Sequence, residues 1–291
     1  MNFLQNNTIQ KFLKNDANTL VLRLALLYLL WFLCRIVFYL QNAADIGTLT
    51  WSEIPELLHG AWMFDTASIL YINALFILLS LLPLRLRERK WYQRMLFWFY
   101  TVTNSLALLI NTADGIYFHY ARKRFTSDEL SYLHNNDNTG TVLLRGIGEN
   151  WYIVLWFALL IFGMIWCYRR IKPMSTRIHN PWGYLGVNLA ILAVGVGLVL
   201  GGIRGGFSRQ TRPITLSNAT LYTASNLKAN LILSNPFCVL RTLGNKALVY
   251  EKFFDQATLD SLYSPYHYPS ATCDTAALSS STSKGSDIAT T

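Results

Sequence analysis

Charged residues are scarce in this chain, and the motifs of common soluble enzymes are missing. Only 14% of its 291 residues are charged and 52% are hydrophobic, whereas charged residues make up about 25% of an ordinary soluble domain. No HxxxH, HExxH, GxSxG, P-loop or GxGxxG pattern occurs, so the usual metal, hydrolase and nucleotide sites are not indicated. The composition argues against an ordinary soluble domain and favours a membrane protein.

The chain also has few cysteines, and none of the four belongs to a CxxC pair. Cys34 and Cys167 lie in apolar runs, where a cysteine behaves as a small core residue. Cys238 and Cys273 follow the last apolar run and could pair in an oxidising compartment, although their surroundings show no disulfide framework. The sequence predicts neither a metal site nor a cofactor in this chain.

The net charge is +9, which in a soluble protein would suggest nucleic acid as a partner. Here the basic residues cluster beside apolar runs, where they set membrane topology and contact anionic lipid head groups. Membrane lipids, and not nucleic acid, are the expected partners.

Five apolar runs are long enough to cross a hydrocarbon core of ~30 Å. They cover residues 20–40, 61–82, 91–110, 151–168 and 182–202. The first run is too long for the apolar region of a signal peptide, and no small-residue cleavage site follows it. The sequence therefore predicts an all-α, polytopic membrane protein with five transmembrane helices in residues 1–203. Five is an odd number and no internal repeat is evident, which argues against a transporter built from two equal halves.

Lysine and arginine in the short loops indicate the orientation. With a cytoplasmic N-terminus, the inner segments hold Lys11 and Lys14, then five basic residues between 85 and 94, then four between 169 and 177. The first outer loop, 41–60, holds no lysine or arginine. We therefore expect a multi-pass protein of the cell (inner) membrane whose C-terminal part is periplasmic or extracellular.

After the last apolar run the chain becomes polar. Residues 204–268 are expected to form an extracytoplasmic juxtamembrane linker, because helices are predicted over 216–233, 236–243 and 255–262. Ser217 is a candidate cap of the first, and the glycines of 201–206 are expected to loosen the end of the last span. Residues 269–291, rich in Ser, Thr and Ala, are expected to be a disordered tail.

Charged side chains inside apolar runs are the first candidates for function, since each is costly in a membrane unless it is paired, wet or able to reach the surface. Arg23 and Arg35 lie near opposite ends of the first run and could extend to the two interfaces. Asp65 lies about one turn inside the outer end of the second run, so it could instead pair with Arg35. Such a pair would be structural, or could hold a zwitterionic head group.

A second polar group follows the third run. Asn104, Asn111 and Asp114 share one helical face, which favours hydrogen bonding between packed helices or a polar wall of a head-group site. Lys123 and Arg124 lie just beyond, where paired cations could hold a phosphate or anchor the chain at the interface. The candidate cluster, for head-group binding or for structure, is thus Arg35, Asp65, Asn111, Asp114, Lys123 and Arg124.

Three stretches, taken in order, resemble the lipoteichoic acid synthase-like, sulfatase-type membrane phosphotransferases. They are FDTASILYINALFILLSLLP in the second run, NTADGIYFHYARKRFT after the third, and RGGFSRQTRPITLSNATLYTASNLKANLILSNPF after the fifth. The resemblance implies an outward-facing alkaline-phosphatase-type domain after the linker. There a metal-activated threonine would transfer phosphoglycerol or phosphoethanolamine from a phospholipid to a cell-envelope acceptor.

The chain departs from this family after Pro269, where the expected strand and acidic metal ligand do not follow. No catalytic or metal residue can therefore be assigned, and a divalent metal is expected only in a catalytic domain outside this chain. The interpretation is an N-terminal membrane portion, truncated and inactive alone, with a separate sulfatase-type chain as a candidate partner. The alternatives are a small transporter or lipid-binding protein using Arg35, Asp65 and Asp114, and a non-functional gene remnant.

Overall fold

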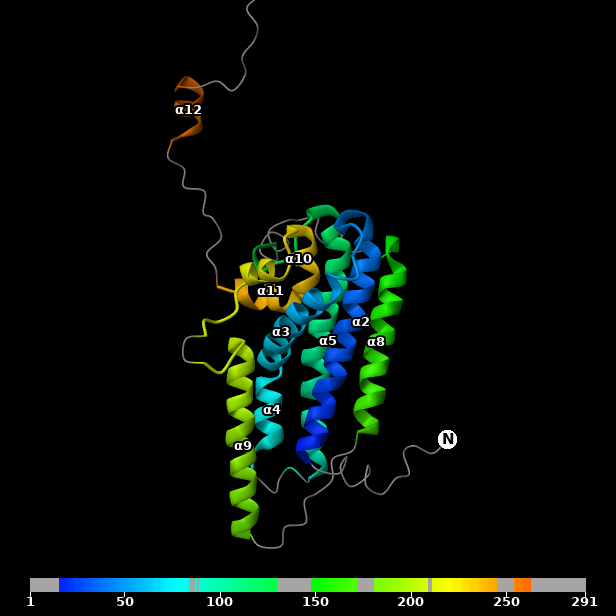
Figure 1. The fold of residues 1–291 in the computed structure, drawn as a ribbon, viewed down its shortest axis with the longest axis vertical. Helices are drawn as coiled ribbons and strands as arrows, with labels where there is room; N and C mark the ends of the chain where they lie inside the picture. The colour runs from blue at the N-terminus through cyan, green and yellow to red at the C-terminus, as the bar shows by residue number, and fades with distance from the viewer. Residues whose placement is uncertain are drawn as a thin grey trace, which may run out of the picture. The chain divides into compact units, whose positions relative to one another are not determined.

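The computed structural model describes residues 16–83, 87, 89–129, 148–171, 181–208, 211–244 and 254–262. All regular elements within these residues are helical (Figure 1), as the composition predicts. The chain divides into two units, residues 1–245 and 246–291. In the second unit the structure describes helix α12 (Gln256–Leu262). The predicted tail, 269–291, and Cys273 lie outside the described residues.

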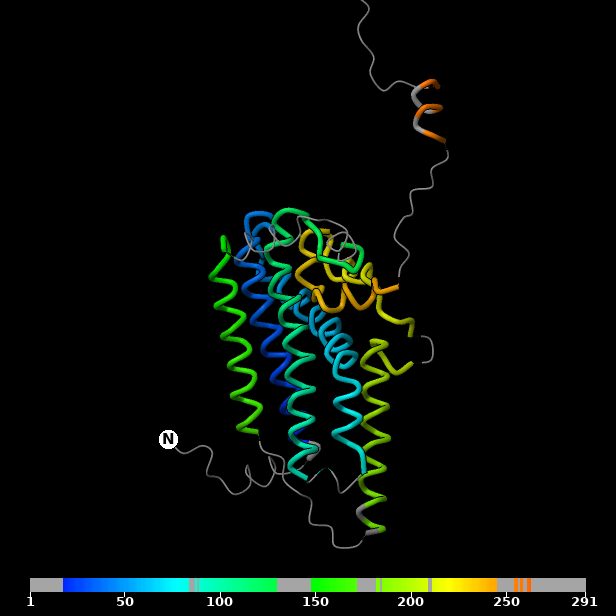
Figure 2. The backbone as a smooth tube through the Cα atoms, turned by 180° about the vertical axis from the view of Figure 1, so that it is seen from behind, coloured from blue at the N-terminus to red at the C-terminus, as the bar shows by residue number. Residues whose placement is uncertain are grey.

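Long helices form the body of the first unit. Helix α2 (Asp16–Ile46) packs against α5 (Lys90–Ala121) and α8 (Trp151–Arg170), while α9 (Pro181–Arg204) lies along α3 (Ile54–Ile72) and α4 (Ala74–Leu81) (Figures 1 and 2). Large apolar side chains fill the core between them, among them Leu27, Trp31, Phe76, Tyr100 and Met164. Many apolar side chains on the outer surface remain exposed, including Val21, Leu40, Leu106, Leu159 and Leu198, which is the pattern expected where lipid surrounds the protein.

Within the described residues, three helices are long and apolar enough to cross a membrane. They are Asn18–Ile46, Trp151–Arg170 and Leu185–Arg204. The pair α3 and α4 would form a fourth span, but the two helices are bent by 63°. Helix α5 covers the predicted run 91–110 and is not among the three, because polar residues such as Thr103 and Asn104 interrupt its apolar sequence. A membrane protein is therefore supported, with fewer clear spans than the five predicted.

The second predicted span, 61–82, differs from the structure in two ways: its helix begins at Ile54, and it breaks at Asn73. The Nδ2 atom of Asn73 donates to the Ile69 carbonyl at 2.9 Å and to Asn104 Oδ1 at 3.0 Å. In return, Asn104 Nδ2 donates to Asn73 Oδ1 at 2.8 Å. A side chain that competes for helix carbonyls in this way bends the helix. The interhelical role predicted for Asn104 is confirmed.

The glycine-rich end of α9 is ordered, contrary to the loosening that the sequence predicted. Gly205 has a φ of +80°, and the amide of Gly206 donates to the Gly201 carbonyl at 2.9 Å. This six-residue closure is a Schellman cap, which needs a left-handed residue just after the helix and so selects glycine. The glycines end the last long helix and do not loosen it.

Residues 211–244 of the linker fold into three short helices, where the sequence predicted one long helix and one short one; the predicted helix 255–262 is present as α12. The three helices are η3 (Leu216–Tyr222), α10 (Asn226–Ile232) and α11 (Asn235–Thr242). The predicted helix 216–233 is interrupted because Thr223 and Ser225 are extended and Ser225 caps α10. Thr215, and not Ser217, caps η3 through reciprocal bonds with Asn218.

These linker helices pack on the first unit through their own apolar core. Phe64 and Ala67 of α3 meet Ala219, Ile232 and Phe237 of the linker, and the Phe64 and Phe237 rings meet edge to face at 5.0 Å. Gly60 permits a close approach, because a Cβ there would lie 2.8 Å from the ring of Tyr222. Residues 211–244 therefore form a fixed cover at one end of the long helices.

Candidate functional site

The structure contains an ion pair between Arg35 of α2 and Asp65 of α3. Arg35 Nη1 and Nη2 each lie 2.7 Å from a different oxygen of the Asp65 carboxylate. The side chains are 12% and 5% exposed, respectively. Two parallel bonds of this kind use the planar fork of the guanidinium and fix its direction. Because α2 and α3 lie side by side, Arg35 and Asp65 neutralise each other. Either charge alone would be costly to bury within an apolar segment.

The remaining donors of Arg35 bind the main chain of the linker. Arg35 Nε donates to the Leu231 carbonyl at 2.7 Å, and Nη2 reaches the Ile232 carbonyl at 3.4 Å. Both carbonyls belong to the last turn of α10, where a helix has no further amides to satisfy them. Asp65 thus orients Arg35, and Arg35 caps a helix of the linker.

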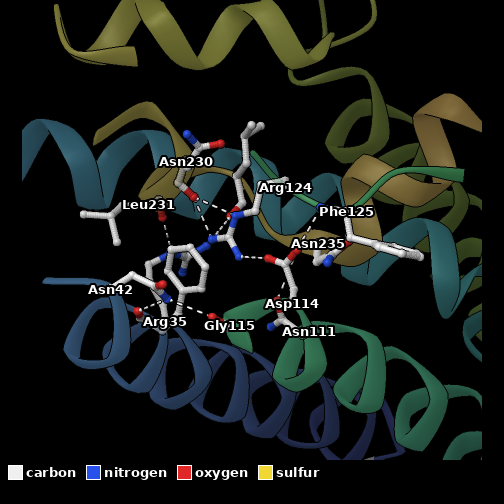
Figure 3. A network of polar contacts seen from close by, with 12 residues as sticks. Arg35, Asn42, Asn111, Asp114, Gly115, Arg124, Phe125, Asn230, Leu231 and Asn235 are labelled. Carbon is white, nitrogen blue, oxygen red and sulfur yellow. Dashed lines mark hydrogen bonds and ion pairs between the residues drawn. The ribbon is translucent and has the colours of Figure 1, made fainter. Parts of the chain in front are cut away.

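A second arginine binds the same helix end from another direction (Figure 3). Arg124 Nη1 pairs with Asp114 Oδ2, and both side chains are almost fully buried. Its Nε and Nη2 donate to the Asn230 carbonyl at 2.9 and 2.6 Å, and Nη2 also donates to the Leu233 carbonyl at 2.8 Å. The guanidinium lies 3.6 Å above the Phe38 ring, so its flat face is covered as well.

Asp114 is held from both sides. Its Oδ2 receives Arg124, and its Oδ1 receives the Phe125 amide at 2.8 Å. The chain turns back on itself here because Arg122, with a φ of 55°, ends α5 in the left-handed conformation. That turn brings Arg124 back over the helix that carries Asp114. We refer to Arg35, Asp65, Asp114 and Arg124 as the linker clamp.

The other two residues of the predicted cluster are placed differently. Asn111 is buried, and its Oδ1 accepts the Asn235 amide at 3.3 Å at the start of α11. Lys123 has a side chain that is 65% exposed and pairs with Glu129 at 2.6 Å. Burial acts to raise the pKa of Glu129, but bonds from Lys123 and Thr126 outweigh it and lower that pKa to about 2. The structure thus brings five of the six residues to the linker and leaves Lys123 at the surface.

Arg23, the other charged residue of the first run, is buried. Its guanidinium lies 3.9 Å from the centre of the Tyr168 ring, and Nη2 donates to the Ile171 carbonyl at 3.2 Å. It therefore joins α2 to the end of α8.

Sequence reasoning missed several contacts that join the linker or its neighbours to the long helices. Glu53 and Lys228 form an ion pair, Asp45 pairs with Arg122, and Asn42 Nδ2 donates to the Phe38 and Gly115 carbonyls. Sequence reasoning also missed the acceptors of Arg35 and Arg124 at residues 230–233. These acceptors are main-chain carbonyl oxygens, so no side-chain pattern could have indicated them.

Cys238 lies in α11 with an exposed fraction of 1%, and burial raises the pKa of its thiol to about 12. A thiol with so high a pKa has little thiolate and is unreactive. In the described conformation it is a core residue of the linker.

The chemistry that these geometries allow is anchoring. The donors of Arg35 and Arg124 point to carboxylates and carbonyls of the protein itself. Among the described residues no group of three or more His, Cys, Asp or Glu side chains could hold a metal ion. No protein-family model matches the chain, and searches of curated proteins and of solved structures find no similar protein.

The Glu53–Lys228 pair predicts a pH-dependent stability. Lys228 Nζ lies 2.8 Å from both carboxylate oxygens, and this bond, with those from Thr50, lowers the pKa of Glu53 from 4.5 to about 2. A carboxylate with a lowered folded-state pKa stabilises the fold above its unfolded pKa and loses that contribution as the pH falls. We expect Glu53→Gln to melt below the wild type at pH 6, and the gap to close as the pH falls from about 4.5 towards 2.

Thermal unfolding of both proteins in detergent across this pH range measures the effect. Glu56→Gln, which removes an exposed carboxylate of the same helical turn, is the control and should show no such gap. A gap for Glu53→Gln that stays constant with pH would contradict the prediction.

Proposed function

We propose that the chain is the membrane domain and linker of a lipid-head-group phosphotransferase of the lipoteichoic acid synthase-like kind. In this proposal α2, the bent pair α3 and α4, α5, α8 and α9 are its five spans, and the N-terminus is cytoplasmic. The observation that carries the proposal is the linker clamp. The clamp binds the linker to the long helices through buried charges. A linker fixed in this way could hold a catalytic domain at a constant height over the membrane.

The cost of burying charges is the reason that the linker clamp supports a role in positioning a domain. A flexible tether needs no buried ion pairs, and each buried charge costs several kcal/mol unless its partner is held in place. Here the arginines of two such pairs both bind the C-terminal end of α10, a helix of only seven residues. A domain fixed beside α10 and α11 would meet phospholipid head groups of the nearby leaflet at a defined distance.

In this proposal the chemistry resides in a sulfatase-type domain outside this chain, which also holds the divalent metal. The phosphoglycerol or phosphoethanolamine group would come from a membrane phospholipid, and diacylglycerol would remain in the bilayer. The chain described here would supply the membrane anchor and the position of that domain, and its localisation would be the inner membrane.

The test is diacylglycerol release from labelled phosphatidylglycerol or phosphatidylethanolamine by membranes of the natural host, with a divalent metal. We expect deletion of the gene to lower this release and its return to restore it. The purified chain should release none. Unchanged release in the deletion strain would overturn the proposed function, and metal-dependent release by the purified chain would overturn the division of roles.

A transporter or lipid-binding role for Arg35, Asp65 and Asp114 has less support. All three side chains are bonded to other groups of the protein. A substrate at these residues would have to replace bonds that also hold the linker.

A further inference from the structure

A pocket is lined by residues near the start of α2 and α5 and at the end of α8; these helix ends lie opposite the linker (Figure 1). Its volume is about 460 Å³, which is within the size range of small-ligand sites. It is formed where the start of α2, the start of α5 and the end of α8 meet. Its lining residues are Arg23, Gln93, Arg94, Phe97, Trp98, Tyr168, Arg169 and Ile171.

Three arginines supply the charge of this pocket, and its described lining contains no carboxylate. Arg23 is 5% exposed and forms a buried part of the wall. Arg94 and Arg169 are exposed, and the Arg169 guanidinium lies 5.4 Å from the centre of the Phe97 ring. Arg94 and Arg169 line the pocket with no carboxylate among its described lining residues, and such guanidinium groups favour an anion, above all a phosphate, whose oxygens match their fork of donors.

Tyr168 is a second, independent sign of a ligand. Its side chain is 5% exposed, and its hydroxyl has no hydrogen-bond partner among the described residues. A buried hydroxyl without a partner is costly and is rare in folded proteins. Its ring is held by Arg23 and by the Phe97 and Tyr100 rings, so the hydroxyl stays in the pocket wall, where a ligand oxygen could satisfy it.

The other walls point to a lipid as the source of the phosphate. Trp98, in the third turn of α5, is 58% exposed beside Phe97, and exposed tryptophan is typical of the head-group region of a membrane. The neighbouring parts of α2 and α8 belong to helices apolar enough to span the bilayer. A phosphate bound among the arginines would therefore have its acyl chains beside these helices.

We propose that this pocket, which we name the arginine pocket, binds the phosphate of an anionic phospholipid from the leaflet opposite the linker. Arg94 and Arg169 hold the phosphate oxygens, the Tyr168 hydroxyl donates to the head group, and Trp98 covers the first part of an acyl chain. The site is separate from the linker clamp and does not depend on the proposed transferase function.

Native mass spectrometry of the chain, extracted from phosphatidylcholine vesicles that contain a minor share of phosphatidylglycerol, tests this site. We expect one retained phosphatidylglycerol. Arg94→Gln and Arg169→Gln should each weaken its binding about tenfold, because each removes a charge-assisted hydrogen bond. Arg170→Gln is the matched control: it removes the same charge one residue away, but Arg170 does not line the pocket and should leave binding within about twofold.

Tyr168→Phe separates a binding role from a structural one. It removes a hydroxyl that has no partner in the described structure, so the lipid-free protein should melt at the same temperature or higher. The rise in melting temperature on adding phosphatidylglycerol should become smaller. If this variant lowers the lipid-free melting temperature and leaves the lipid-induced rise unchanged, the hydroxyl is structural and its proposed role is wrong.

Three further results would overturn the proposal. Equal weakening by Arg94→Gln and Arg170→Gln would mean that positive charge near the membrane acts without a specific site. Displacement of the retained lipid by millimolar inorganic phosphate or glycerol phosphate would mean that the pocket binds a free phosphate and not a lipid. Retention of phosphatidylcholine as strongly as phosphatidylglycerol would contradict the preference for an anionic lipid.

Discussion

Replacing Arg124 by alanine is expected to lower the free energy of unfolding by about 3–5 kcal/mol, the usual cost of removing one partner of a buried ion pair. Asp114 would remain buried, with one bond from the Phe125 amide. The Asn230 and Leu233 carbonyls would lose the guanidinium that they share. One substitution therefore leaves a buried carboxylate without its counter-charge and two of the carbonyls at the end of α10 without their donor, while Arg35 still binds the other two.

Unfolding of the purified chain in detergent, by heat or by denaturant, measures this loss. Hydrogen exchange of residues 226–233 reports separately whether α10 has come away from the long helices. Lys123→Ala is the control, because it removes the neighbouring cation, which belongs to a surface pair, and should cost about 1 kcal/mol or less. Arg124→Lys should fall between the two, since an ammonium keeps the charge but not the fork of donors.

A cost for Arg124→Ala as small as that of Lys123→Ala would contradict the structural role of the linker clamp. If Arg124 instead bound a lipid head group, its loss would change lipid binding and leave the exchange of α10 unaltered. The two measurements together distinguish these roles.

Replacing Asp65 by asparagine is the second change with a large expected effect, about 3 kcal/mol. Arg35, with a side chain that is 12% exposed, would lose its counter-charge and one of the two carboxylate oxygens that direct it. Its bonds to the Leu231 and Ile232 carbonyls would then weaken as well. We expect a lower yield of folded protein and faster hydrogen exchange in α10.

A double-mutant cycle that combines Asp65→Asn with Arg35→Leu tests whether the pair acts as a unit. Removing both charges avoids the cost of a lone buried charge, so the double variant should be more stable than Asp65→Asn alone. It should still show fast exchange in α10, because no donor then reaches the Leu231 carbonyl from this position. Additive effects of the two substitutions would argue against the pair.

The same Asp65→Asn variant distinguishes the structural role from a transport role. A transport residue would lose function at normal stability and yield, whereas a clamp residue loses stability first. If Asp65→Asn folds as well as the wild type and abolishes a transport signal, the structural interpretation is wrong.

How far the sequence predicted this protein depends on the kind of interaction. The long apolar runs predicted helices at 20–40, 151–168 and 182–202, and the structure has helices that can cross a membrane there. Length and apolarity are local properties, so they can be read from a run of residues. The run 61–82 was predicted as one span, but Asn73 breaks it through a bond to Asn104, 31 residues further along the chain.

The candidate site shows the same limit. Arg35, Asp65, Asp114 and Arg124 were notable from the sequence because charges beside apolar runs need partners. The positions of Arg35 and Asp65 in the first two runs indicate that they could pair. That both arginines also cap α10 was not predictable, since their acceptors are the main-chain carbonyls of residues 230–233, which every amino acid carries.

The sequence by itself determined the class of protein and the residues whose charges needed an explanation, because hydrophobicity and charge belong to single side chains and add up along a run. Only the tertiary structure decided what those charges bind. Residues 211–244 lie in a fixed place over the long helices because two guanidinium groups, each directed by a carboxylate, meet the open end of α10. These hydrogen bonds join parts of the chain that are more than a hundred residues apart, so no local sequence pattern could predict them.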